Sequence, residues 1–152
     1  MARDISNSDD VIDSRDVIKR IEELEGERET LADEIEEHRA AHEAAEESAP
    51  DADFDEAKAF TRAEENLEEW DNDNGDELKT LKKLADDGET LGDWTYGVTL
   101  IRESYCQELV EDIGDMPKDF PSYIVIDWEA TARNLRADYT EIDYDGIAYL
   151  AR

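Results

Sequence analysis

Residues 17–45, "VIKRIEELEGERETLADEIEEHRAAHEAA", decide the class of fold, because apolar and long side chains recur there at alternating spacings of four and three. A heptad repeat of this kind places its members along one seam of a helix. The stretch therefore predicts a coiled-coil helix that begins near Ser14 or Asp16 and ends before Pro50, which cannot continue a helix. The seam positions are Val17, Ile21, Leu24, Arg28, Leu31, Ile35, His38, His42 and Ala45.

A second segment repeats the same spacing after "ESAPDADFD", at Ala57, Phe60, Ala63, Leu67 and Trp70. It predicts a helix that folds back on the first to form a hairpin. A third helix is expected after the interruption "NDNG", because Asn74 followed by Glu77 resembles a capping box. Its buried stripe would be Leu78, Leu81 and Leu84, with Gly88 as the carboxyl-terminal stop.

The remaining residues predict mixed secondary structure. "TLIRESYCQELVEDIG" (99–114) has the spacing of a helix that ends at Gly114, and "SYIVID" (122–127) is typical of a short strand. Asp127 is a good cap for a helix that places Trp128, Ala132, Leu135 and Tyr139 on one face. An Asp145-Gly146 turn between two alternating runs predicts a β-hairpin.

The expected fold is thus α+β: an acidic, coiled-coil-like helical hairpin, then a small mixed module with helices and a short antiparallel sheet. We expect three regions, namely a flexible amino terminus (1–13), an acidic helical region (14–88) and a small α+β module (89–152). The seam also allows a second copy to pair along any part of it that stays unburied.

Charge is the most unusual feature of the 152-residue chain. Its 45 Asp and Glu outnumber 16 Lys and Arg, which gives a net charge of -29, far more than solubility requires. The excess is uneven, since residues 1–88 carry 31 acidic and 11 basic side chains, whereas the last 64 residues carry 14 and 5. So acidic a surface repels nucleic acid and anionic headgroups alike, which excludes direct binding to either.

The chain offers no clear secretory signal. The single Cys106 cannot form an internal disulfide, the first residues lack the apolar core of a signal peptide, and no apolar run is long enough to cross a bilayer. We therefore expect a cytoplasmic protein.

Three sequence patterns resemble a zinc site, a calcium site and a reactive thiol, but each departs from what that site requires. His38 and His42 have the spacing of zinc ligands, but "HRAAHE" has Arg39 where a zinc protease has Glu, and both histidines lie on the seam. An EF-hand register for "DNDNGDELKTLK" would put Trp70 and Leu81 where carboxylates are needed. Cys106 has mainly Glu nearby, which raises a thiol pKa. We therefore expect no enzyme activity, no metal and no cofactor.

The density of carboxylates in the hairpin invites comparison with a nucleic acid. A helix from Asp16 to Glu47 is about 48 Å long and carries 13 carboxylates, and the segment from Asp55 to Asp87 adds 12. Together they present one carboxylate per about 1.9 Å, against one phosphate charge per about 1.7 Å of duplex DNA. The nine Lys and Arg in the same segments reduce this to one net charge per about 3 Å, close to the value of a single strand.

The carboxylates are also aligned. Glu22, Glu29, Glu36 and Glu43 recur every seven residues and so form a row on one face of a helix, where like charges lower helix stability. "EENLEEWDNDNGDE" (64–77) holds eight carboxylates and no Lys or Arg. The candidate phosphate-mimicking residues are Glu22, Glu29, Asp33, Glu36, Glu37, Glu43, Glu64, Glu65, Glu68, Glu69, Asp71, Asp73, Asp76 and Glu77.

Two stretches carry a family resemblance. "YIVIDWEATARNLRADYTEIDYDGIAYLAR" (123–152) resembles the carboxyl-terminal part of ArdA-type antirestriction proteins, with their "D-[YW]-E-x-x-A-R-x-L" helix and short hairpin. "DWTYGVTLIRESY" (93–105) is similar to small proteins of phages and mobile elements. The matching residues of the helix are Asp127, Trp128, Glu129, Ala132, Arg133, Leu135, Asp138 and Tyr139.

The resemblance implies a mobile-element protein that mimics DNA and blocks a host defence nuclease, usually a type I restriction enzyme. The acidic half has no counterpart in the longer ArdA fold, and a CRISPR effector also holds nucleic acid in basic channels, so the expected partner is a basic protein of either system. Two alternatives stay open: an acidic coiled-coil adaptor that makes protein contacts, and adaptation to a salt-rich host.

Overall fold

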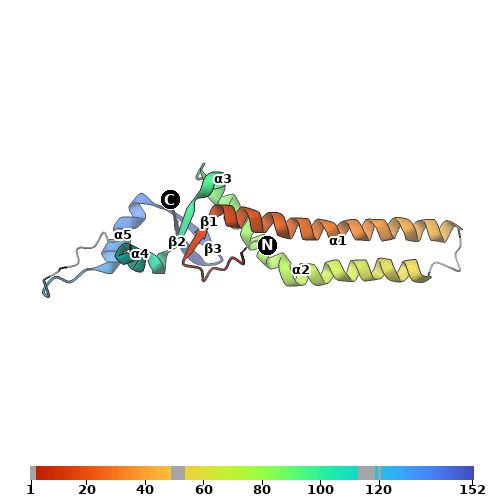
Figure 1. The fold of residues 1–152 in the computed structure, drawn as a ribbon, viewed down its shortest axis with the longest axis horizontal. Coiled ribbons are helices and arrows are strands. Elements are labelled where there is room, and N and C mark those ends of the chain that lie inside the picture. The colour runs from red at the N-terminus through yellow and green to blue at the C-terminus, as the bar shows by residue number, and fades with distance from the viewer. Residues whose placement is uncertain (1–2, 49–53, 113–118, 120) are drawn as a thin grey trace. The chain divides into compact units, whose positions relative to one another are not determined.

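A computed structural model of the chain describes residues 3–48, 54–112, 119 and 121–152. It confirms the α+β class, with a long helical hairpin followed by short helices and a four-stranded antiparallel sheet (Figure 1). The chain divides into two compact units, each described here by itself. The first, here called the acidic hairpin, comprises residues 21–79. The second, here called the sheet unit, comprises residues 3–20 and 80–152.

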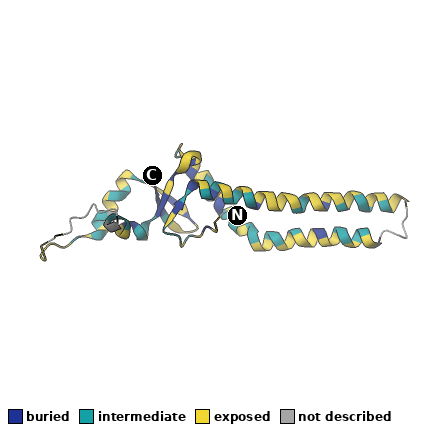
Figure 2. Cartoon of the chain, viewed as in Figure 1, coloured by how far each residue is buried: buried dark blue, intermediate teal, exposed yellow. Residues whose placement is uncertain are grey.

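The two long helices are α1 (Ser14–Ser48) and α2 (Phe54–Glu89). Within the acidic hairpin their predicted seam is confirmed, since Leu24, Ile35 and Ala63 are buried and the other apolar seam residues are half-buried. Figure 2 shows how sparse the buried positions are along both helices, where most residues are exposed or half-buried. An antiparallel pair of helices needs only one apolar stripe on each partner, so the outward positions remain in solvent.

The predicted interruption at "NDNG" is wrong, because α2 passes through it without a break. The side-chain amide of Asn74 does not cap a new helix; its Nδ2 donates to the carbonyl of Trp70, one turn earlier, at 3.2 Å. Gly75 lies within the helix with open space around it. The apolar repeat, from Leu67 through Leu78, thus outweighs four residues that individually disfavour a helix.

The assignment of Gly88 as a helix stop is also wrong. Gly88 lies inside α2, and the first left-handed residue after the helix is Gly92, with φ of 74°. A Cβ on Gly88 would lie 2.2 Å from the ring of Trp94 in the short helix α3 (Trp94–Gly97). Gly88 is therefore required for close packing of the buried indole rather than for backbone conformation.

The sheet is formed by β1 (Val11–Asp13), β2 (Thr99–Arg102), β3 (Thr140–Tyr144) and β4 (Ile147–Ala151). The strand order is β1-β2-β4-β3, and every neighbouring pair is antiparallel. Strand β1 (Val11–Asp13), which pairs Ile12 with Leu100 of β2, was not predicted, and it lies in the segment expected to be flexible. Two tyrosine hydroxyls donate to the same amino-terminal segment: Tyr149 to the carbonyl of Asp9 at 2.6 Å, and Tyr144 to that of Ile5 at 3.1 Å.

The helix predicted over 99–114 begins later than expected. Thr99–Arg102 is strand β2, Glu103–Tyr105 is a 3-10 turn, and only then does α4 (Cys106–Asp112) begin. Leu100 and Ile101 are both buried, which suits a central strand covered on both faces better than one stripe of a helix. The expected end of the helix, at Ile113 and Gly114, lies outside the described residues.

The carboxyl-terminal elements follow the prediction in part. Asp127 caps α5 (Trp128–Asp138) and accepts a hydrogen bond from the N–H of Ala130 at 3.0 Å. The hairpin is confirmed: β3 (Thr140–Tyr144) and β4 (Ile147–Ala151) flank a turn in which Asp145 and Gly146 have φ of 50° and 82°. The strand predicted over "SYIVID" is wrong, since residues 122–127 form no strand and pair with none.

A buried hydroxyl fixes the start of α1 within the sheet unit. Ser14, the predicted helix start, is fully buried and donates to the carbonyl of Trp94 at 2.6 Å while it accepts from the N–H of Val98 at 2.7 Å. The hydroxyl is therefore satisfied as both donor and acceptor, as burial of a polar group requires. Here it connects α1 to the segment that leads into β2.

Candidate functional site

The row of carboxylates on α1 is exposed along its whole length. Glu22, Glu29, Glu36 and Glu43 are all exposed, in agreement with their placement on the outer face of the helix. One member is compensated, because Arg39 lies 2.9 Å from Glu36 on the same helix. Both side chains of that pair are largely in solvent, where an ion pair contributes little to stability.

The carboxylates of the acidic hairpin outnumber its cations by more than four to one. Over the described residues of this unit there are 22 Asp and Glu and five Lys and Arg. Asp71 and Glu77 are half-buried, and the other twelve predicted mimic residues are exposed: Glu22, Glu29, Asp33, Glu36, Glu37, Glu43, Glu64, Glu65, Glu68, Glu69, Asp73 and Asp76.

The stretch 64–77 contains no cation of its own, but α1 supplies one. Arg28 holds Asp71 in a bidentate pair, with Nε and Nη2 donating to the two carboxylate oxygens at 2.8 and 3.1 Å. The hydrogen bonds from Arg28 lower the pKa of Asp71 below its usual value. Beside it the indole Nε1 of Trp70 donates to Glu27 at 3.1 Å. Asp71 thus connects the two helices, a contact that the sequence of residues 64–77 alone does not predict.

The histidines contribute to packing between the helices. The ring of His42 stacks on the ring of Phe60 in α2, with 6.1 Å between their centroids. The Arg39 guanidinium lies 5.9 Å from the centroid of the Phe60 ring. Both His38 and His42 are half-buried, as expected for seam positions. Across the described part of the chain, no three His, Cys, Asp or Glu side chains are grouped so that they could hold a metal ion.

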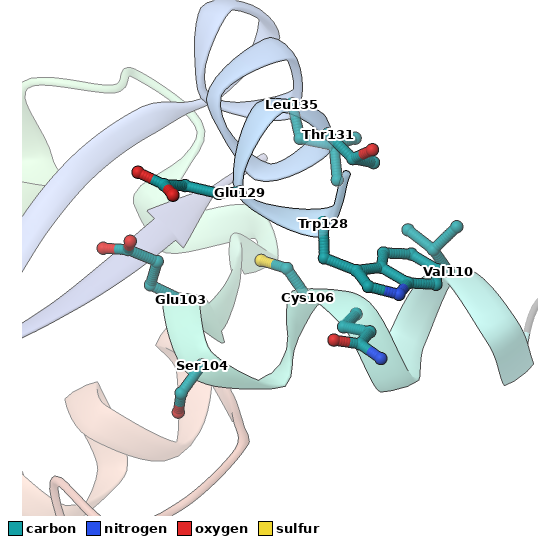
Figure 3. Close-up of a pocket in the computed structure, with 9 residues that line it drawn as sticks. Glu103, Ser104, Cys106, Val110, Trp128, Glu129, Thr131 and Leu135 are labelled. Atoms are coloured by element: carbon teal, nitrogen blue, oxygen red, sulfur yellow. The ribbon is translucent and has the colours of Figure 1, made fainter. Parts of the chain in front are cut away.

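A small pocket of about 230 Å³ lies between α4 and α5 of the sheet unit (Figure 3). Cys106 faces it and is only 4% exposed, and burial raises the pKa of its thiol. Glu103, on the pocket wall, forms an ion pair with Arg136, and both histidines belong to the other unit. No described group of this pocket favours the thiolate, so the geometry does not support nucleophilic chemistry there.

None of the described helices is both long enough and apolar enough to cross a bilayer. Comparison with models of known protein families, with curated proteins and with solved structures finds no match. The functional interpretation therefore depends on the surface of the acidic hairpin.

Proposed function

We propose that the protein is a cytoplasmic DNA mimic that inhibits a host defence enzyme by occupying its basic nucleic-acid channel. The enzyme would be a type I restriction enzyme or a CRISPR effector. The observation that carries the proposal is the exposure of twelve aligned or clustered carboxylates on a hairpin with only five cations among its described residues.

The spacing of the carboxylates, before the five cations are subtracted, is close to that of the phosphates of a duplex. Residues 21–48 of α1 span about 42 Å, and residues 54–79 of α2 run antiparallel beside them over a similar length. Their 22 carboxylates amount to one per about 1.9 Å of that length, compared with about 1.7 Å per phosphate in DNA. Subtraction of the five cations leaves 17 net charges, or one per about 2.5 Å, a value between those of a duplex and of a single strand. Binding of either ligand in a basic channel would release counterions.

Contacts between the two helices strengthen the comparison. A mimic binds well when its charges are held in place before contact, because ordering them on binding costs free energy. The Arg28–Asp71 pair, the Trp70–Glu27 hydrogen bond and the His42–Phe60 stack each join α1 to α2. The carboxylates therefore lie on two helices that contact each other through side chains at several points.

The expected resemblance of residues 123–152 to ArdA-type proteins, and of residues 93–105 to small proteins of phages and mobile elements, points to the same class of function. It concerns the sheet unit, whereas the carboxylate argument concerns the acidic hairpin, so the two are independent. The resemblance favours restriction over CRISPR as the system that is inhibited.

Competition with DNA tests the proposal. A purified type I restriction methyltransferase, loaded with a labelled duplex of about 30 base pairs, should release the duplex as the protein is added, and excess duplex should displace the protein in turn. A Cas9-type effector with guide RNA is tested in parallel. A ternary complex of enzyme, duplex and protein would contradict occupation of the channel, and binding to neither enzyme would remove both named targets.

An adaptor that uses the coiled-coil seam makes a different prediction. Its partner would contact seam side chains, so Leu31→Ala or Ile35→Ala would weaken binding more than any change of outer carboxylates. The burial of Leu24 and Ile35 within the hairpin disfavours this alternative, because these side chains are already covered by the facing helix.

A further inference from the structure

The sheet unit contains a second cavity, larger than the pocket of Figure 3, with which it shares three lining residues. Its volume is about 450 Å³, within the range of about 300–1,000 Å³ that is typical of sites for small ligands. The core of this part of the unit forms its walls, through apolar side chains of β2, α4, α5 and β4. These are Ile101, Cys106, Leu109, Val110, Leu135 and Leu150.

Two residues of opposite charge, Asp138 and Arg152, line the same cavity. Both are exposed, so they lie where the cavity opens to solvent. Asp138 is the last residue of α5, and Arg152 follows β4. The main chain of Arg152 forms two hydrogen bonds with Thr99, each of 3.1 Å, and its guanidinium lies 5.7 Å from the centroid of the Tyr139 ring. Contacts thus hold both the base and the head of the Arg152 side chain.

Neither of these charges is neutralised by a neighbour. Within the described part of the chain, no ion pair joins Asp138 or Arg152 to each other or to a third residue. The last carbonyls of α5 add a partial negative charge beside Asp138, because the carboxyl end of a helix dipole is negative. The lining of the cavity therefore offers one place for a positive group and another for a negative group, next to apolar walls.

We propose that this cavity binds a free α-amino acid with an apolar side chain, such as phenylalanine or leucine. The ammonium group would pair with Asp138, the carboxylate with the guanidinium of Arg152, and the side chain would enter the apolar part.

The charge of the chain decides between ligands. A net charge of -29 repels a simple anion, and a simple cation finds many competing carboxylates on the acidic hairpin. A zwitterion has no net charge, so the field of the whole protein neither repels it nor draws it to other surfaces. It also matches both charged groups of the cavity. The inference does not rest on the proposed function, because it concerns the sheet unit alone.

Amide chemical shifts of the full chain, measured by NMR during titration with L-phenylalanine, test the proposal. The shifts of Ile101, Leu135 and Leu150 should change and saturate, whereas those of the acidic hairpin should stay constant. 2-Phenylethylamine lacks the carboxylate and 3-phenylpropionate lacks the ammonium group, so each should bind at least about tenfold more weakly. Glycine lacks the apolar side chain and should cause no saturable change.

Two variants assign the charged groups. Arg152→Gln should weaken binding of L-phenylalanine at least about tenfold but should not weaken binding of 2-phenylethylamine, which has no carboxylate to lose. Asp138→Asn should likewise weaken binding of L-phenylalanine but not of 3-phenylpropionate. Structural damage would instead weaken binding of every ligand. Arg62→Gln, at an exposed position of α2, is the matched control for Arg152→Gln and should bind as the parent does.

Three results would overturn the proposal. The first is the absence of saturable shifts up to about 10 mM L-phenylalanine, a concentration that would reveal even a weak site. The second is equal affinity for all three aromatic ligands, which would mean that the cavity takes an apolar ring without recognising the zwitterion. The third is a set of shifts confined to the acidic hairpin, which would place the binding outside the cavity.

Discussion

The two units differ in opposite ways in charge and in burial: the acidic hairpin has the larger excess of carboxylates, and the sheet unit has more buried residues. The described residues of the acidic hairpin include 22 carboxylates and five cations, and only four of them, Leu24, Ile35, Ala63 and Leu78, are buried. The sheet unit holds 20 carboxylates and ten cations among its described residues, together with most of the core. A pair of helices buries only one narrow apolar seam, so most of its residues face solvent and can be charged. A small α+β unit must bury a larger fraction of its residues in a core, so fewer of its positions can be charged.

This comparison bears on adaptation to salt. A solvent-driven acidification should affect both units to a similar degree. The ratio of acidic to basic residues is instead about twice as high in the acidic hairpin, as counted in the described residues. The excess in one unit favours a specific role for that surface.

The largest expected loss of stability comes from a substitution in the core of the sheet unit, compared with one in the seam of the acidic hairpin. Leu100 is fully buried in β2, so Leu100→Ala should lower the free energy of unfolding by about 2–5 kcal/mol. Leu31 is half-buried on the hairpin seam, and Leu31→Ala should cost less. Urea unfolding followed by circular dichroism measures both. Equal losses would mean that the seam is packed as tightly as the sheet core.

Two glycines of the same helix should respond with opposite sign. Gly88→Ala forces a Cβ against the rigid Trp94 ring and should destabilise the protein by about 1–3 kcal/mol. Gly75→Ala meets nothing within 4 Å and should stabilise it by about 0.5–1 kcal/mol through helix propensity. Thermal melts of the two variants give the comparison, and stabilisation by Gly88→Ala would refute the tight contact.

Alkaline pH should destabilise the sheet unit before the acidic hairpin. Burial raises the pKa of Tyr149 to about 12, above its usual value near 10. The stability linked to this neutral hydroxyl is therefore fully present below pH 10 and declines as pH rises through about 12. Tyr149→Phe should lower stability near neutral pH, since it removes the bond to Asp9, but should flatten that decline. If Tyr149→Phe loses stability with rising pH as steeply as the parent, the loss comes from the titration of groups other than Tyr149.

The smallest effect concerns the pair between the long helices. Asp71→Asn should cost about 1 kcal/mol at most, because both side chains are partly in solvent. The lowered pKa of Asp71 means that its contribution is present above the usual carboxyl pKa and is lost as pH falls. Asp73→Asn, at an exposed position two residues away, is the control. A larger loss from Asp73→Asn would contradict the role of Asp71.

The sequence predicts the parts of the fold that depend on local periodicity. The heptad seam of α1, the Asp127 cap and the Asp145-Gly146 turn each follow from neighbouring residues, and each is confirmed. Strands β1 and β2 could not be predicted in the same way. Val11–Asp13 is a strand because it pairs with residues about ninety positions away, and pairing over such a distance leaves no local periodic signal.

The candidate site was predictable in outline for the same reason. Helical spacing places Glu22, Glu29, Glu36 and Glu43 on an exposed face, as observed. It does not indicate which carboxylates meet a cation from the other helix, so the contact of Asp71 with Arg28 required the structure. Local cap preferences likewise predict a break near Gly75, whereas the longer apolar repeat keeps α2 continuous through it.

Removal of the aligned charges tests the central claim most directly. Glu22, Glu29, Glu36 and Glu43 are replaced together by Gln, and the control neutralises four exposed carboxylates of the sheet unit with Asp86→Asn, Glu89→Gln, Glu108→Gln and Glu141→Gln. The two variants have equal net charge. Each is measured for displacement of a duplex from a type I restriction methyltransferase between about 0.05 M and about 0.3 M salt.

The account predicts that the hairpin variant folds at least as well as the parent, because repulsion between its carboxylates is relieved. It should nevertheless bind about tenfold or more weakly and lose part of the salt dependence, while the control stays close to the parent. Equal binding by the parent and the hairpin variant at about 0.15 M salt would contradict the claim that this row imitates a phosphate backbone.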